Sequence, residues 1–246
     1  MTKGTKVLII ILIIIIIIAG ALLAYRFYLG TKNEEDIISL GTDVVVNEVE
    51  NQEPEKQVEI FNGNERPIAV MIDNHKGALP QGGLNNAYMV YEIIVEGGES
   101  RLMALFKGQD LEKIGPVRSA RHYFLDYALE NDAIYVHFGW SPQAESDISD
   151  LGVNNINGIF ESETSFWRTR DKSAPHNVAT STEKILEIAE TKGYRQTSTK
   201  ESVLNYVTEE VNLENGIIAN TVEIPYSESN EVRYGYNPET QRYQRF

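Results

Sequence analysis

The sequence contains no cysteine, which excludes disulfide bonds, thiolate metal sites and a lipid-modified N-terminal cysteine. Basic residues are scarce, because 22 Lys and Arg stand against 36 Asp and Glu, for a formal net charge of −14. Nonspecific nucleic-acid binding requires a basic surface that displaces counterions, so we expect no nucleic acid as a partner. The four histidines form no HExxH motif and no other paired spacing, so we expect no metal and no cofactor.

One long apolar run is present at the N-terminus, VLIIILIIIIIIAGALLA, residues 7–24. These eighteen uncharged residues, at 1.5 Å per helical residue, nearly span the roughly 30 Å of bilayer hydrocarbon. Lys3 and Lys6 precede the run, and the acidic residues 34–36 follow it. We therefore predict a transmembrane signal anchor over residues 1–30, with a cytoplasmic N-terminus and an extracytoplasmic remainder.

Cleavage of this segment is the alternative, because Ala19-Gly20-Ala21 fits a signal-peptidase site. The apolar run, however, continues past that site into Tyr25, Phe27 and Tyr28, which resemble an interfacial aromatic anchor. This continuation favours an uncleaved, single-pass anchor.

The rest of the chain divides into three parts. Residues 31–64 are acidic and polar and predict a linker. Residues 65–200 alternate strand-like and helix-like segments, which predicts an α/β domain: a mixed β-sheet with flanking helices. Residues 201–246 end in a strand, a turn and a strand, EVRYGYNPETQRYQRF. We expect this part to be the truncated beginning of a small β-rich domain, or a hairpin that docks on the first domain.

Within the α/β domain, buried strands are predicted over 66–74 and 133–140, and helices over 118–131, after Ser141-Pro142, and from Thr180 to Gly193. Two β-rich runs around Gly97-Gly98 predict a hairpin. A two-residue turn would place Glu96 opposite Glu99, and a four-residue loop would place it opposite Arg101. Pairing of opposite charges favours the second register.

Five ordered blocks resemble a known family: RPIAVMIDNH, VYEIIVEGGESRLMALF, EKIGPVRSARHYF, DAIYVHFGWSPQA and APHNVATS. They are similar to the YerB-like bacterial envelope proteins, which carry domain of unknown function 3048. The resemblance implies an N-terminal α/β domain, a smaller β-rich C-terminal domain and, commonly, a lipoprotein of a Gram-positive bacterium. It implies no particular activity. This chain departs from the family in lacking the lipid-bearing cysteine, which the predicted anchor replaces, and in ending soon after the C-terminal domain starts.

Ser141 in GWSPQ begins like a nucleophile elbow, but the closing glycine is missing. The residue after a nucleophilic serine must donate its backbone N–H to the oxyanion, and Pro142 has none. An N-cap explains Ser141 without catalysis.

Two basic clusters are the stronger candidates for a site. Arg118 and Arg121, with Lys113 and His122, lie near the start of the predicted helix 118–131, where free backbone N–H groups favour an anion. The alternative for these arginines is structural ion pairing with Glu92 or Glu96. A second cluster is the loop WRTRDKSAPHN, which supplies His176 and Asn177 and adds Arg168, Arg170 and Lys172. If the two clusters meet, the resulting pocket would be strongly cationic.

Asp73 ends the first predicted strand, where ligands bind in α/β sheets, although an Asp-Asn pair there also makes a turn. His137 reads as a buried, hydrogen-bonded histidine in preference to a catalytic one.

The sequence therefore predicts a single-pass envelope protein that binds an anionic envelope ligand or a protein partner. The residues expected to bind are Arg118, Arg121, His176 and Asn177, with Asp73 and His137 as second choices. The alternative is a cell-wall-active hydrolase or transferase that uses His137 or His176 as acid/base and the two arginines as clamps.

Overall fold

The computed structural model describes residues 63–207, 211, 216–228 and 230–246. The chain divides into two units, 1–54 and 55–246, and the description below concerns the second. The predicted anchor over 7–24 and nearly all of the predicted linker lie outside the described residues. None of the helices in the described part of the chain has the length and apolarity needed to span a bilayer.

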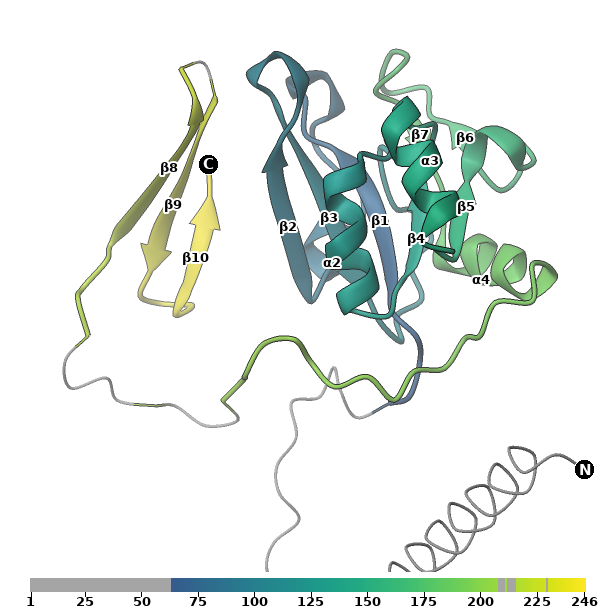
Figure 1. The fold of residues 1–246 in the computed structure, drawn as a ribbon. Coiled ribbons are helices and arrows are strands. Elements are labelled where there is room, and N and C mark those ends of the chain that lie inside the picture. The colour runs from purple at the N-terminus through teal and green to yellow at the C-terminus, as the bar shows by residue number, and fades with distance from the viewer. Residues whose placement is uncertain (1–62, 208–210, 212–215, 229) are drawn as a thin grey trace, which may run out of the picture. The chain divides into compact units, whose positions relative to one another are not determined.

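A five-stranded mixed sheet organises the α/β domain, with strand order β2-β3-β1-β4-β5 (Figure 1). β1, β4 and β5 run parallel to one another, and β3 is antiparallel to both β1 and β2. The predicted mixed sheet is thereby confirmed. The strands are β1 (Ile68–Asp73), β2 (Met89–Ile94), β3 (Ser100–Phe106), β4 (Ile134–His137) and β5 (Asn155–Asn157).

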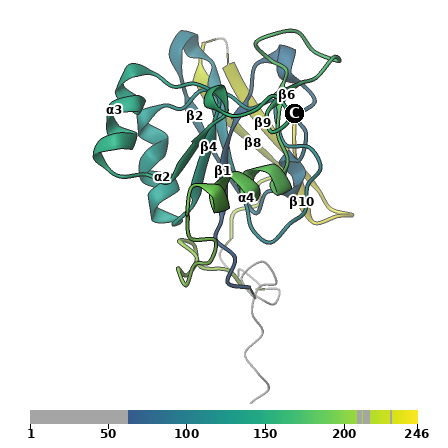
Figure 2. The ribbon, with the colours of Figure 1, turned by 90° about the vertical axis from the view of Figure 1, so that its right-hand side faces the viewer.

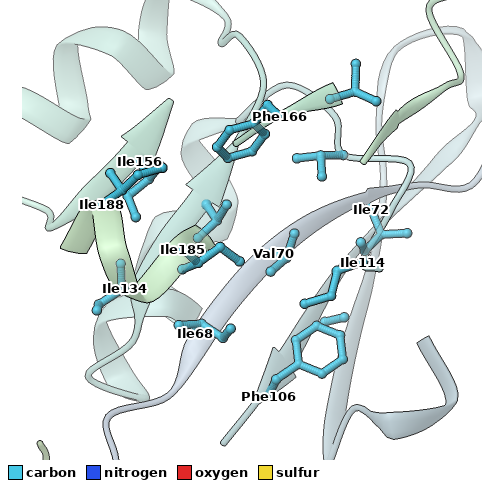
Figure 3. Packing of buried hydrophobic residues seen from close by; sticks show 14 of the residues in the cluster. Ile68, Val70, Ile72, Phe106, Ile114, Ile134, Ile156, Phe166, Ile185 and Ile188 are labelled. Atoms are coloured by element: carbon cyan, nitrogen blue, oxygen red, sulfur yellow. The ribbon is translucent and has the colours of Figure 1, made fainter. Parts of the chain in front are cut away.

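Helices cover both faces of this sheet (Figure 2). On one face, α2 (Leu125–Glu130) and α3 (Pro142–Asp150) share a buried cluster with Met71, Met103 and Tyr135. On the other face, Ile185 and Ile188 of α4 (Thr182–Thr191) belong to a second buried cluster, which also contains the alternate strand residues Ile68, Val70 and Ile72 (Figure 3). Because helices cover both faces of the sheet, the side chains on both faces of β1 are buried, which explains its continuous apolar run from Ile68 to Ile72.

The remaining elements are short. A two-stranded sheet pairs β6 (Trp167–Arg168) with β7 (Val178–Ala179). Five 3-10 turns are η2 (Lys76–Ala78), η3 (Leu84–Asn86), η4 (Glu96–Gly98), η5 (His122–Phe124) and η6 (Gly158–Phe160).

A separate three-stranded antiparallel sheet closes the chain, with order β10-β9-β8. Its strands are β8 (Thr221–Ser227), β9 (Asn230–Asn237) and β10 (Arg242–Arg245). The predicted hairpin corresponds to β9 and β10 and is confirmed, whereas β8 was not predicted.

The predicted helix over 118–131 is wrong in its first half. Residues 116–118 are extended, because they bond to strands: the Asp73 N–H donates to the Pro116 carbonyl at 2.9 Å and the Arg118 N–H to the Met71 carbonyl at 2.9 Å. A 3-10 turn, η5, follows, and only Leu125–Glu130 is α-helical. Arg118 therefore does not lie at a helix N-terminus, whereas Arg121 is the N-cap residue of the short turn η5 and makes no side-chain cap hydrogen bond there.

The hairpin between β2 and β3 has neither predicted register. Its loop is the three-residue turn η4, Ile94 pairs with Ser100, and the Val95 N–H donates to the Glu99 carbonyl at 2.7 Å. Arg101 consequently lies opposite Ile93 on one side and opposite Asp73 on the other.

The helix caps were predicted more accurately. Ser141 caps α3, accepting the Ala144 N–H at 3.2 Å, with Pro142 as the first helical residue. The capping interpretation of Ser141 is therefore confirmed. The N-cap of α4 is Ser181, one residue after the predicted start of this helix at Thr180, whose hydroxyl donates to the Ser165 carbonyl.

Candidate functional site

The carboxyl end of β1 is a topological switch point. After β1 the chain continues to β2 and β3 on one side, whereas β4 continues through α3 to β5 on the other side. In open α/β sheets, ligands bind outside the strand ends at such a point. Asp73 lies here, is the last residue of β1 and is only 4% exposed.

The buried Asp73 carboxylate has two hydrogen-bond partners, His176 and the backbone of His75, and one ion-pair partner, Arg118. His176 Nδ1 lies 2.7 Å from its Oδ2, and the backbone N–H of His75 donates to its Oδ1 at 3.0 Å. Arg118 Nε lies 3.2 Å from the same Oδ2. An ionised carboxylate can only accept, so His176 Nδ1 donates in this contact. The Nε2 of His176 is left for another partner, as an acceptor in the neutral ring and as a donor in the protonated ring.

The His176 ring is also fixed from the side. It stacks on the His75 ring, with centroids 4.3 Å apart and an interplanar angle of 11°. The His75 ring is in turn held by its Nδ1, which accepts the backbone N–H of Gly77 at 3.0 Å. The orientation of His176 is therefore determined by both Asp73 and His75.

Arg118 has a fixed backbone and an incompletely bonded side chain. Its N–H donates to the Met71 carbonyl, and its carbonyl accepts the Phe138 N–H, each at 2.9 Å. Its Nε is buried and, despite its proximity to Asp73, makes no aligned hydrogen bond. Within the described residues, no hydrogen bond involves its two terminal nitrogens, and the side chain is 26% exposed. The guanidinium can therefore bond to a ligand.

Arg101 is the residue that sequence reasoning missed. It faces Asp73 across the β1–β3 ladder, is 7% exposed, and its Nη1 donates to the Ser119 carbonyl at 2.6 Å. Burial, together with the nearby Arg121 and Arg118, lowers the pKa of Arg101 to about 10, against the opposing effects of Asp73 and Glu96. The signal in the sequence was an arginine inside an otherwise apolar strand, which is costly to bury without partners.

Arg121 has a different role from Arg118. Its Nε and Nη2 donate to the two carboxylate oxygens of Glu96 at 2.7 and 2.9 Å. These hydrogen bonds lower the pKa of Glu96 to about 2. This geometry corresponds to the ion-pairing alternative considered above, and the guanidinium is already occupied.

Asn177 shapes the loop that carries His176. Its Oδ1 accepts from Arg168 Nη1 at 2.7 Å, and its Nδ2 donates to the carbonyls of Thr169 and Lys172 at 3.1 and 3.3 Å. Because the whole amide is bonded inside the loop, Asn177 positions His176 and has no free group of its own.

His137 lies in the core. It is 0% exposed, its Nδ1 contacts the Gly139 carbonyl at 2.8 Å and its Nε2 contacts Asn155 Oδ1 at 3.1 Å. Burial lowers the pKa of His137 to about 4. With both ring nitrogens engaged, His137 fits the structural interpretation and is poorly placed for acid/base chemistry.

The structure thus brings together Asp73, Arg118 and His176 from the predicted set and places Arg121, Asn177 and His137 elsewhere. The arrangement offers one imidazole nitrogen and one guanidinium edge beside a shared carboxylate. It suits an anion at the guanidinium, or proton transfer at Nε2. No group of three or more His, Asp or Glu in the described part of the chain is placed to hold a metal ion.

Comparison with known families assigns the domain. Residues 53–195 match the model described as "Protein of unknown function (DUF3048) N-terminal domain". The chain belongs to this family. The matched span of the DUF3048 domain contains Asp73, Arg101, Arg118 and His176, hence the whole site.

The relatives of this DUF3048 chain agree with the assignment. The chain is 42% identical over 130 residues to the putative lipoprotein YerB of Bacillus subtilis (strain 168), covering 53% of this chain and 39% of that protein. A crystal structure of the YerB protein from Bacillus subtilis matches with a TM-score of 0.67 and 34% identity, over 78% of this chain and 63% of that chain. The chain therefore spans less than two thirds of the length of either relative.

Proposed function

We propose that the DUF3048 domain of this protein binds an anionic envelope ligand through Arg118 and His176, and that residues 7–24 hold the protein at the cell membrane with the domain outside. The observation that carries the proposal is the Arg118 side chain. Its terminal nitrogens bond to no described residue, whereas the neighbouring Arg121 is fully paired with Glu96.

Local charge supports an anion. The charge of Arg101 is opposed by those of Arg121 and Arg118 and is favoured by those of Asp73 and Glu96. These three arginines and two carboxylates leave a local excess of positive charge, although the whole chain has a net charge of −14. A guanidinium presents paired donors that match a carboxylate or a phosphate group. A protein partner that offers a surface carboxylate would use the same donors.

Support for the envelope comes from two sources. The relative from Bacillus subtilis is described as a putative lipoprotein, and lipoproteins are held at a membrane by their lipid. This chain has no cysteine to carry a lipid, and its apolar run of eighteen residues has nearly the length of a membrane span.

A second candidate function is acid/base catalysis on wall material. The 2.7 Å contact between Asp73 and His176 favours it, because a carboxylate that holds one imidazole nitrogen fixes the orientation of the ring and directs the other nitrogen toward a substrate. In this hydrolase or transferase, His176 would move the proton and Arg118 would stabilise the developing negative charge.

Calorimetric titration of the full chain in a nonionic detergent, against inorganic phosphate, citrate and a muropeptide, tests the proposal. We expect saturable binding that Arg118→Gln weakens by about tenfold or more. The matched control is Arg121→Gln, which removes the same charge from the Glu96 pair and should retain most of the affinity. Equal affinity of wild type and Arg118→Gln, or no saturable binding, would contradict the proposal. Muropeptide turnover that disappears in His176→Gln would instead establish the catalytic candidate.

A further inference from the structure

A second surface of the domain has the features of a binding site. It is an open groove of about 740 Å³ beside α3, β5 and η6, and none of Asp73, Arg118 and His176 lines it. This volume lies within the range of about 300–1,000 Å³ typical of ligand sites. The elements α3 and β5, which border the groove, are labelled in Figure 1.

Aromatic rings form one part of this groove. Trp140 and Phe160 both line it, with ring centroids 5.7 Å apart and planes tilted by 54°. Phe160 is 71% exposed, which leaves the ring unsupported by the core and available to a ligand. An exposed aromatic ring offers an apolar face on which the C–H groups of a ligand can pack.

Unused hydrogen-bond donors form another part. Asn157 is 5% exposed, and its Oδ1 accepts the backbone N–H groups of Gly139 and Ile159 at 2.9 and 3.2 Å. These two donors fix the orientation of the amide, so Nδ2 is the atom left over, and it bonds to no described residue. The indole N–H of Trp140 likewise bonds to no described residue. The Asn157 Nδ2 is not one of the buried atoms without a partner in the described residues, so solvent reaches it and a ligand could accept from it.

The charges along the groove restrict the ligand. Its lining contains three carboxylates, Glu145, Asp150 and Glu161, and a single cation, Lys192, which pairs with Glu161 at 3.2 Å. An anionic ligand would face an excess of negative charge. A simple polyamine would match the carboxylates but would offer no acceptor to Asn157 or Trp140. A neutral ligand that both donates and accepts meets both requirements.

Strand addition by a peptide at β5 is disfavoured. β5 is an edge strand of the five-stranded sheet, so its outer side could in principle pair with another chain. The carbonyl of Asn155, however, already accepts the Tyr194 hydroxyl at 3.0 Å, and the strand is only three residues long.

We propose that this groove binds an uncharged oligosaccharide, with a pyranose ring packed on Phe160 and Trp140 and its hydroxyl or acetamido oxygens accepting from Asn157. Sugar rings combine apolar C–H faces with equatorial groups that donate and accept. The carboxylates of the groove then serve as hydroxyl acceptors.

The test uses fluorescence of the full chain, kept in a polyoxyethylene detergent because a maltoside headgroup would compete. The chain has two tryptophans, so a Trp167→Phe background leaves Trp140 as the reporter. Chitotetraose and cellotetraose are the probes. We expect at least one to give a saturable change in Trp140 emission, weakened about tenfold by Phe160→Ala.

Three controls make the outcome decisive. Leu151→Ala truncates another exposed apolar side chain, 54% exposed, that does not line the groove, and it should bind as the background protein does. Arg118→Gln should also leave oligosaccharide binding unchanged, so this inference and the anion site succeed or fail separately. The inference is overturned if neither neutral oligosaccharide binds, if Phe160→Ala binds equally well, or if trigalacturonate or spermine binds more tightly than both neutral probes.

Discussion

At the scale of single residues, two histidines of one domain have opposite environments. His176 is 20% exposed in its side chain, shares a proton with Asp73 and keeps one nitrogen unbonded within the described structure. His137 is completely buried with both nitrogens in contact with polar atoms. The first environment suits a ligand, and the burial of the second favours the neutral form of the ring.

The buried histidine predicts a specific pH dependence of stability. Burial lowers the pKa of His137 from 6.5 to about 4, so between these values the unfolded chain binds a proton that the folded domain does not. The free energy of unfolding should fall as the pH drops from about 6.5 to about 4, by at most about 3 kcal/mol. Urea unfolding of wild type and His137→Gln at pH 7, 5.5 and 4.5 measures this effect.

The variant should show a flatter dependence on pH than wild type over this interval. His122→Gln, which alters an exposed histidine, is the control and should follow wild type. Parallel curves for wild type and His137→Gln would show that His137 does not titrate in this way.

At the scale of elements, local patterns predicted what local forces determine. Strand β1 was predicted from an apolar run, and the start of α3 was predicted from Ser141-Pro142. Both signals act within a few residues of the chain. The start of the predicted helix 118–131 was wrong because residues 116–118 bond to β1, a partner remote in sequence. The hairpin register was wrong because Arg101 interacts across the sheet with groups outside the hairpin.

The cap of α3 gives a test at this scale. Replacing Ser141 with Ala removes the acceptor of the Ala144 N–H and should lower the free energy of unfolding by about 1 kcal/mol. Anion binding at Arg118 should not change, because Ser141 has no catalytic or ligand role in this account. Ser149→Ala, later in the same helix, is the control. Unchanged stability of Ser141→Ala would contradict the capping role of Ser141.

At the scale of the whole molecule, the site could be predicted only in part. Asp73 and His176 are 103 positions apart. No pattern in a single sequence indicates that the loop carrying His176 reaches Asp73 at the end of β1. The residue types were informative, since a strand-end aspartate, an arginine and a loop histidine were all predicted candidates. Arg101 was not predicted, because its contribution depends on the register between β1 and β3.

The proposed anchor gives a prediction for the intact chain. If residues 7–24 span the membrane with the domain outside, the expressed protein should remain in the membrane fraction after an alkaline carbonate wash. Protease added to intact cells with a permeable wall should then degrade the domain. Deleting residues 1–30 should release the domain from the membrane fraction. Release of the full chain by carbonate, or protection from external protease, would contradict the predicted topology.

The most direct test of the central claim is a nitrogen-15 NMR spectrum of the histidine rings during titration with inorganic phosphate. Only four histidines are present, and His176→Gln assigns the relevant pair of signals. The account predicts that His176 carries its proton on Nδ1 and that its Nε2 signal shifts saturably with phosphate, while His137 and His122 do not move. An unperturbed His176, or equal shifts of His176 and His122, would contradict an anion site at Asp73, Arg118 and His176.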